Sequence, residues 1–179
     1  MGKIAIIGAA SRLGREIRQQ AQDICMTDLV LYDAQPMTGP ASELEQVAQY
    51  QGQLTALQPL VKCLRHCVGV VLLDIQDPRA TLRNIEAMTL LDKQQLVTIT
   101  PDIQYVQIAM SQSLHHVPMN QAWKRNIEMS VQLLKESDLL VECIDPPSYD
   151  EQVGNDRLIS LISQRFIAEI MGLLEASSE

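Results

Sequence analysis

Short apolar runs alternate along the chain with segments whose apolar residues recur at spacings of three and four. The runs are rich in β-branched residues and predict buried strands, and the spaced segments predict helices. The expected strands are 3–7, 29–32, 53–57, 68–73, 96–100 and 139–144. The expected helices are 11–24, 42–51, 59–66, 78–91, 102–114, 121–136 and 156–174. This alternation predicts an α/β fold in one domain, a doubly wound, mostly parallel Rossmann-like sheet in the order 3-2-1-4-5-6.

Length and charge narrow the class of protein. The 179 residues correspond to roughly one domain, and we expect the tail 175–179 to fray. The formal charge of -8 argues against binding to nucleic acid, which requires a basic face. No apolar run is long enough to span a membrane or to form a signal peptide. The sequence therefore predicts a cytoplasmic protein with neither nucleic-acid nor membrane partners.

The turn between the first strand and the first helix carries a phosphate-binding pattern, Gly8-Ala-Ala-Ser11-Arg12-Leu-Gly14. Gly8 permits a tight turn, Gly14 permits close packing of the helix, and the helix N-terminus presents free N–H groups to a diphosphate. Ser11 replaces the middle glycine of the usual pattern and is expected to weaken the fit, although its hydroxyl can donate to phosphate. Arg12 and Arg15 could compensate through their charge.

Acidic residues follow the strands at the same edge of the predicted sheet. Asp33 ends the second strand and could accept hydrogen bonds from the adenosine ribose, which favours NAD over NADP. Asp74 follows the fourth strand. The candidate cofactor-binding residues are Gly8, Ala10, Ser11, Arg12, Leu13, Gly14, Asp33 and Asp74. The alternative is a dinucleotide-type fold whose site is empty or repurposed.

These motifs resemble the NAD-binding domain of the lactate/malate dehydrogenase family. The resemblance rests on residues 3–10, 13–14 and 29–33, on 39–44 and on 64–71, and it covers about residues 3–74. Beyond them, 96–100 with Pro101 is similar to the family's fifth strand and its Asn-Pro, with Thr100 in place of Asn. A rival match for that motif is 139–144 with Asp145. The resemblance implies an NAD cofactor.

The catalytic half implied by that family is not found in the sequence. Such dehydrogenases add a second domain with a His/Asp proton relay. Here His66 precedes the fourth strand and His115 and His116 follow a helix, so all three are expected at the amino edge, far from the cofactor. The Tyr and Lys four residues apart of short-chain dehydrogenases are also missing. Catalytic residues are therefore unknown. Arg79 and Arg83 are the candidates for binding a substrate carboxylate, with helix-surface charges as the alternative.

We expect no metal site. The strand-end carboxylates lack a metal-binding spacing and favour helix capping instead; they are Asp33, Asp74, Asp102 and Asp145. Cys63, His66 and Cys67 share a helical face but have no fourth ligand. The cysteines of this chain, Cys25 and Cys143 included, are expected to be buried thiols.

The last predicted helix has an apolar stripe wider than a peripheral helix needs, marked by Leu158, Ile162, Phe166, Ile170 and Leu173. Either the stripe is buried within the monomer or part of it makes a homodimer contact. For the whole chain we weigh three functions. The first is an NAD(H)-binding sensor, regulator or accessory subunit without full catalytic machinery. The second is a small NAD-dependent oxidoreductase acting on a hydroxy acid or carbonyl compound. The third is a nucleotide-free interaction protein.

Overall fold

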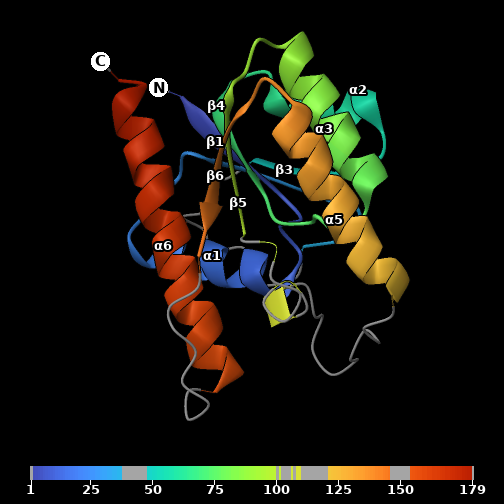
Figure 1. Ribbon diagram of the computed structural model, residues 1–179. Helices are drawn as coiled ribbons and strands as arrows, with labels where there is room; N and C mark the ends of the chain where they lie inside the picture. Colours follow the sequence, from blue (N-terminus) through green and yellow to red (C-terminus); the bar gives the residue numbers. More distant parts are fainter. Residues whose placement is uncertain are drawn as a thin grey trace.

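The computed structural model describes residues 2–37, 48–99, 101, 106, 108–109, 121–145 and 154–178, with the backbone alone for 48–51 (Figure 1). The strands are β1 (Lys3–Ile7), β2 (Leu29–Asp33), β3 (Ala48–Gln51), β4 (Cys67–Leu72), β5 (Gln95–Ile99) and β6 (Leu140–Ile144). The helices are α1 (Arg12–Asp23), α2 (Leu57–Leu64), α3 (Pro78–Leu90), α5 (Gln121–Glu136) and α6 (Asn155–Ala176).

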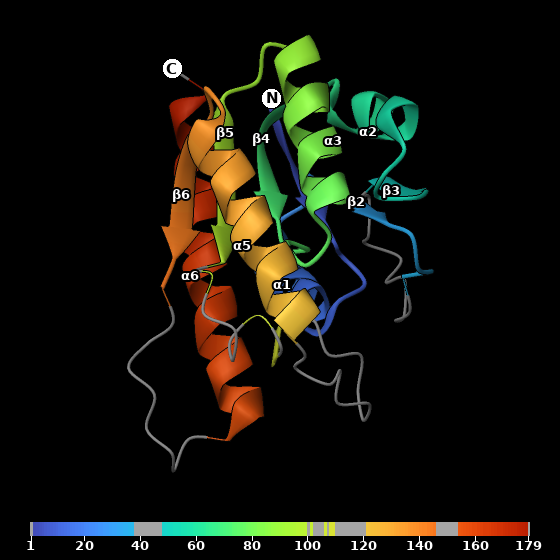
Figure 2. The same ribbon diagram turned by 45° about the vertical axis from the view of Figure 1, so that its right-hand side comes forward.

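The six strands form one parallel sheet in the order β3-β2-β1-β4-β5-β6, the order that the sequence pattern predicts. Helices α1 and α6 pack together on one face, and α2, α3 and α5 cover the other (Figures 1 and 2). The chain therefore crosses from one face to the other between β1 and β4, which is the point where a doubly wound sheet opens a crevice for ligands.

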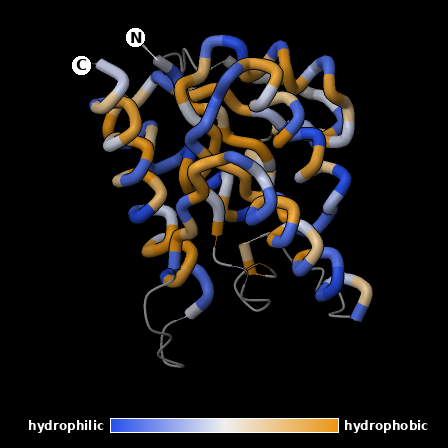
Figure 3. The backbone as a smooth tube through the Cα atoms, turned by 45° about the horizontal axis from the view of Figure 1, so that its top comes forward, coloured by the Kyte–Doolittle hydropathy of each residue, from blue (hydrophilic) through white to orange (hydrophobic). Residues whose placement is uncertain are grey.

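The core is aliphatic, as expected from a chain with 3% aromatic residues. The β1 residues Ile4, Ala5, Ile6 and Ile7 are fully buried, because helices cover both faces of the central strands. Figure 3 shows hydrophobic and hydrophilic stretches alternating along the helices.

The third strand is not where the sequence pattern places it. We expected a helix over 42–51 and a strand over 53–57, but the strand is Ala48–Gln51, and 52–56 lead into α2. This strand lies at the edge of the sheet, where pairing with β2 holds it. The N–H of Gly52 donates to the carbonyl of Asp33 at 3.0 Å, so Gly52 ends a strand and not a helix. Residues 42–47 lie outside the described residues.

In helix α3 the small residues Ala80 and Ala87 are buried, whereas Leu82 is 40% exposed. Helix α3 lies against both α2 and α5. The expectation that all the cysteines are buried is wrong for two of them. Cys25 and Cys143 are exposed, because Cys25 lies in the turn after α1 and Cys143 lies on the edge strand β6.

Helix α6 uses its wide apolar stripe within the chain. Leu158, Ile162, Phe166 and Ile170 are buried, against α1 and the sheet. The helix continues to Ala176, so its last turn includes residues that we had placed in a frayed tail. In the part of the chain that the structure describes, no helix is long and apolar enough to cross a membrane.

Candidate functional site

The site that the sequence pattern predicts is built around the β1–α1 turn. Gly8 has a φ of 87°, a conformation that favours glycine, and a Cβ there would lie 3.2 Å from the backbone nitrogen of Asp74. A Cβ on Gly14 would lie 2.5 Å from the carbonyl oxygen of Ala9, so α1 can pack this closely against the turn only with glycine at that position. Both glycines therefore have the geometric roles expected from the sequence.

Ser11, which stands in place of the middle glycine, is the N-cap of α1. Its hydroxyl accepts a hydrogen bond from the N–H of Gly14 at 3.1 Å, and its own N–H donates to the carbonyl of Gly8 at 3.1 Å. The N–H groups of Arg12 and Leu13 bond to no described residue. Within the described part of the chain these two donors thus have no partner at the positive end of a helix dipole, the arrangement that binds phosphate, and Leu13 itself is buried.

Asp33 is buried and holds the turn. One carboxylate oxygen accepts the N–H of Ala10 at 2.9 Å, and the other accepts the N–H of Gln35 at 3.0 Å. These bonds use about half of the acceptor sites of a carboxylate. Asp33 could offer its remaining acceptor sites to a ribose. It would then bind the ribose and fix the shape of the turn at the same time.

Asp74 lies next to the turn at the end of β4. Burial raises its pKa to about 6, and the nearby carboxylates of Asp33 and Asp77 add to that rise. The N–H of Gln76 donates to Asp74 at 3.3 Å and works in the opposite direction. The carboxyl edge of the sheet thus carries Asp33 and Asp74 close enough to interact, as the order of the strands predicts.

Trp123 reaches the same edge from α5, which the sequence reading did not anticipate. Its indole N–H donates to the side-chain oxygen of Gln76 at 2.9 Å. The spacing of Trp123 from Ile127, another buried residue of α5, was the signal that could have placed it on the inner face. This tryptophan therefore lies beside the loop that carries Asp74.

Arg12 is held away from the turn that its backbone helps to form. Its guanidinium donates to the carboxylate of Asp156, in the first turn of α6. No sequence signal points to this pair, because 144 residues separate its members. Arg15 is half-buried and pairs with no described carboxylate. Arg12 and Arg15 were expected to attract a phosphate through their charge, but the guanidinium of Arg12 is already paired with Asp156.

Other candidate residues lie away from the turn. Arg79 pairs with Asp77, and Arg83 pairs with Glu86. Both arginines are exposed on α3, so they fit the alternative that they are helix-surface charges and not ligands of a substrate carboxylate. His66 is exposed and directly precedes β4, at the amino edge as predicted. His115, His116, Thr100 and Asp102 lie outside the described residues.

Cys63 and Cys67 are buried thiols, as expected. Burial raises the pKa of Cys63 to about 12 and that of Cys67 to about 11, so both are neutral thiols. Among the described residues no cluster of three histidine, cysteine or acidic side chains is placed to hold a metal ion.

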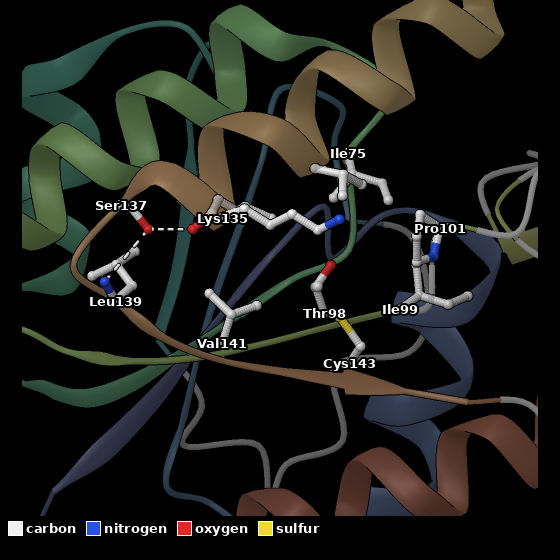
Figure 4. Close-up of a pocket in the computed structure, with 11 residues that line it drawn as sticks. Ile75, Thr98, Ile99, Pro101, Lys135, Ser137, Leu139, Val141 and Cys143 are labelled. Atoms are coloured by element: carbon white, nitrogen blue, oxygen red, sulfur yellow. Dashed lines mark hydrogen bonds between the residues drawn. The ribbon is translucent and has the colours of Figure 1, made fainter.

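A second concave site lies between α5 and the strands β5 and β6 (Figure 4). It is a cavity of about 330 Å³. Its lining is mostly apolar, with Lys135, Thr98, Ser137 and Cys143 as the polar members. Ile75 lines one end of this cavity and directly follows Asp74 in the chain.

The arrangement of strands and helices matches solved NAD(P)-binding proteins. A short-chain dehydrogenase/reductase from Veillonella parvula, solved with NADP, superposes with a TM-score of 0.63 at 13% identity, over 78% of this chain and 66% of that one. The fold is a Rossmann fold. A Rossmann-fold NAD(P)-binding protein from Shigella flexneri gives a TM-score of 0.65 at 13% identity, over 92% of this chain and 85% of that one.

A nucleoside-diphosphate-sugar epimerase from Staphylococcus aureus gives a TM-score of 0.59 at 15% identity, over 80% of this chain and 50% of that one. This chain thus spans between half and two thirds of the length of the dehydrogenase/reductase and the epimerase. No protein-family model and no curated protein matches the sequence. The similar structures are short-chain dehydrogenases and epimerases, so the finer resemblance to lactate/malate dehydrogenases is not confirmed.

Proposed function

We propose that this chain binds a nicotinamide adenine dinucleotide, with the diphosphate at the β1–α1 turn. The observation that carries the proposal is that the N–H groups of Arg12 and Leu13 have no partner among the described residues, at a helix N-terminus whose close packing requires Gly14. The turn lies where the chain crosses between the two faces of the sheet, the usual ligand position in this fold. The Veillonella protein of the same fold was solved with NADP.

NAD is favoured over NADP because of Asp33. Its carboxylate is buried at the end of β2, where a 2′-phosphate would meet negative charge from both Asp33 and Asp74. The residues proposed to bind the cofactor are Gly8, Ala10, Ser11, Arg12, Leu13, Gly14, Asp33 and Asp74. Of these, Ala10 contributes by fixing the turn to Asp33.

We propose a sensor, regulatory or accessory role for the bound chain, in which occupancy follows NAD(H). No described histidine lies at the carboxyl edge, and the sequence has no Lys four residues after a Tyr. The kinship with the cofactor domain of lactate/malate dehydrogenases stays part of this proposal and rests on the motifs in residues 3–74. A small oxidoreductase acting on a hydroxy acid or carbonyl compound is the second candidate. The third is an interaction protein without nucleotide.

Titration with NADH tests the proposal through the lone tryptophan. Trp123 bonds to Gln76 beside Asp74, so a bound dinucleotide is expected to quench its fluorescence. Calorimetry on the Trp123→Phe variant is the control, because heat of binding should persist while the optical signal is lost. If millimolar NADH produces neither quenching nor heat, dinucleotide binding is refuted. Equal affinity for NADPH would overturn the role given to Asp33.

Turnover separates the first two functions. The chain is incubated with NAD and a panel of small hydroxy acids, and formation of NADH is followed by absorbance. The sensor role predicts binding without turnover. Turnover that disappears on substitution of Asp33 or Arg79 would instead favour the oxidoreductase.

A further inference from the structure

The cavity lies between α5 and the β5–β6 end of the sheet. Helix α5 packs against α3. Strand β6 contacts its neighbour β5 and the helix α6. Every second residue of the β6 segment, Leu139, Val141 and Cys143, lines the cavity, so Glu142 points to the opposite face of the sheet. Among the described residues, an apolar strip of the sheet thus faces the cavity on the α5 side.

One positive charge extends over this apolar strip. Lys135 projects from the last turn of α5, and Figure 4 shows its amino group directed along the cavity toward Thr98 and Ile75. Within the described part of the chain no carboxylate forms a salt bridge with it. The Thr98 hydroxyl donates to the carbonyl of Leu72 at 2.6 Å, so it is fixed in place and retains a lone pair to accept a hydrogen bond.

We propose that this cavity binds a small organic acid, with the carboxylate on Lys135 and an apolar body against Leu134, Leu139 and Val141. Small-molecule sites are typically mostly apolar with a few convergent polar groups, and this volume lies at the lower end of their range. A ligand of a few carbons fits that volume. The inference concerns a site separate from the dinucleotide turn and does not depend on the proposed function.

Hexanoate and hexanamide are the matched probes, because they share the apolar body and differ in charge. Binding is measured by calorimetry and by amide chemical shifts in the 15N-labelled chain, without dinucleotide. We expect hexanoate to shift the amides of residues 139–143 and to bind about fivefold more tightly than hexanamide, the contribution of an ion pair with the exposed Lys135.

Lys135→Gln is the test variant, and Lys124→Gln is its control, because Lys124 is an exposed lysine of the same helix outside the cavity lining. Lys135→Gln should remove the preference for the acid, and Lys124→Gln should keep it. The proposal is overturned if neither probe shifts residues 139–143. It is equally overturned if the wild-type chain binds both probes with the same affinity, or if both lysine variants weaken hexanoate alike.

Discussion

At the scale of single residues, two glycines in helices have opposite surroundings. Gly14 meets the backbone of Ala9, whereas nothing lies within 4 Å of a Cβ on Gly172 in α6. Gly14→Ala is therefore expected to lower the free energy of unfolding by about 2 kcal/mol through overpacking. Gly172→Ala should raise it by about 0.5–1 kcal/mol, since alanine loses less backbone entropy in a helix. Urea unfolding of both variants measures the difference, and equal effects would contradict the close packing of α1 on the turn.

Asp74 makes stability depend on pH in an unusual direction. Its pKa in the folded chain, about 6, lies above the ordinary value of 3.8, so the folded chain holds this proton more tightly than the unfolded chain does. The stabilisation is fully present below about pH 4 and is lost as the pH rises through about 6.

Asp74→Asn should remove this component and make the chain more stable than wild type at neutral pH. Asparagine keeps an acceptor for the N–H of Gln76. The measurement is urea unfolding of both proteins between pH 4.5 and about pH 7.5, with the exposed Asp138→Asn as the control. Parallel stability curves for wild type and Asp74→Asn would show that Asp74 is not the titrating group.

Single residues of the site were predictable where one local geometry requires them. Gly8 and Gly14 could be placed because the turn needs their missing side chains. Asp156 and Gln76 could not be placed, because their contacts with Arg12 and Trp123 join segments that only the tertiary fold brings together. The internal bonds of Asp33 were missed because the type of residue does not reveal which acceptors are already occupied.

At the scale of elements, the link between α1 and α6 affects the proposed cofactor site. Asp156 of α6 holds the guanidinium of Arg12, which a diphosphate would otherwise attract. Asp156→Asn should therefore tighten NADH binding about two- to fivefold, since such exposed pairs contribute up to about 1 kcal/mol. Stability should change by less than about 1 kcal/mol, the size of a lost charge in the first turn of a helix.

Glu169→Gln is the matched control for this variant, because it removes an exposed negative charge from the same helix without touching Arg12. Calorimetric titration with NADH compares the two. If both tighten binding equally, the effect comes from the net charge and not from the release of Arg12.

Elements were predictable where the apolar pattern is strong. Helix α5 has the expected bounds, and buried strands such as β4 stand out as apolar runs. The edge strand β3 was misplaced because its backbone pairing with β2 selects it, while its sequence, Ala-Gln-Tyr-Gln, has little apolar pattern. In α3 the inner face includes the small residues Ala80 and Ala87, and apolar spacing alone does not distinguish that face from the one with the exposed Leu82.

At the scale of the whole molecule, most of the apolar stripe of α6 is buried within the folded chain. Its buried residues pack on α1 and the sheet, and Met171 is 43% exposed. We expect Met171→Glu to leave the mass measured by analytical ultracentrifugation unchanged. A fall in mass from dimer to monomer would show that α6 carries the dimer contact that its sequence pattern allowed.

The open edge of the sheet has a consequence for how molecules of this protein meet in solution. Among the described strands, β6 pairs with β5 alone, so the backbone groups on its outer side offer a template for another copy. If two β6 strands aligned antiparallel about their common midpoint, Glu142 of one would stand directly opposite Glu142 of the other. Like charges facing each other across strands repel, so Glu142 is expected to disfavour the pairing of two β6 strands in this register.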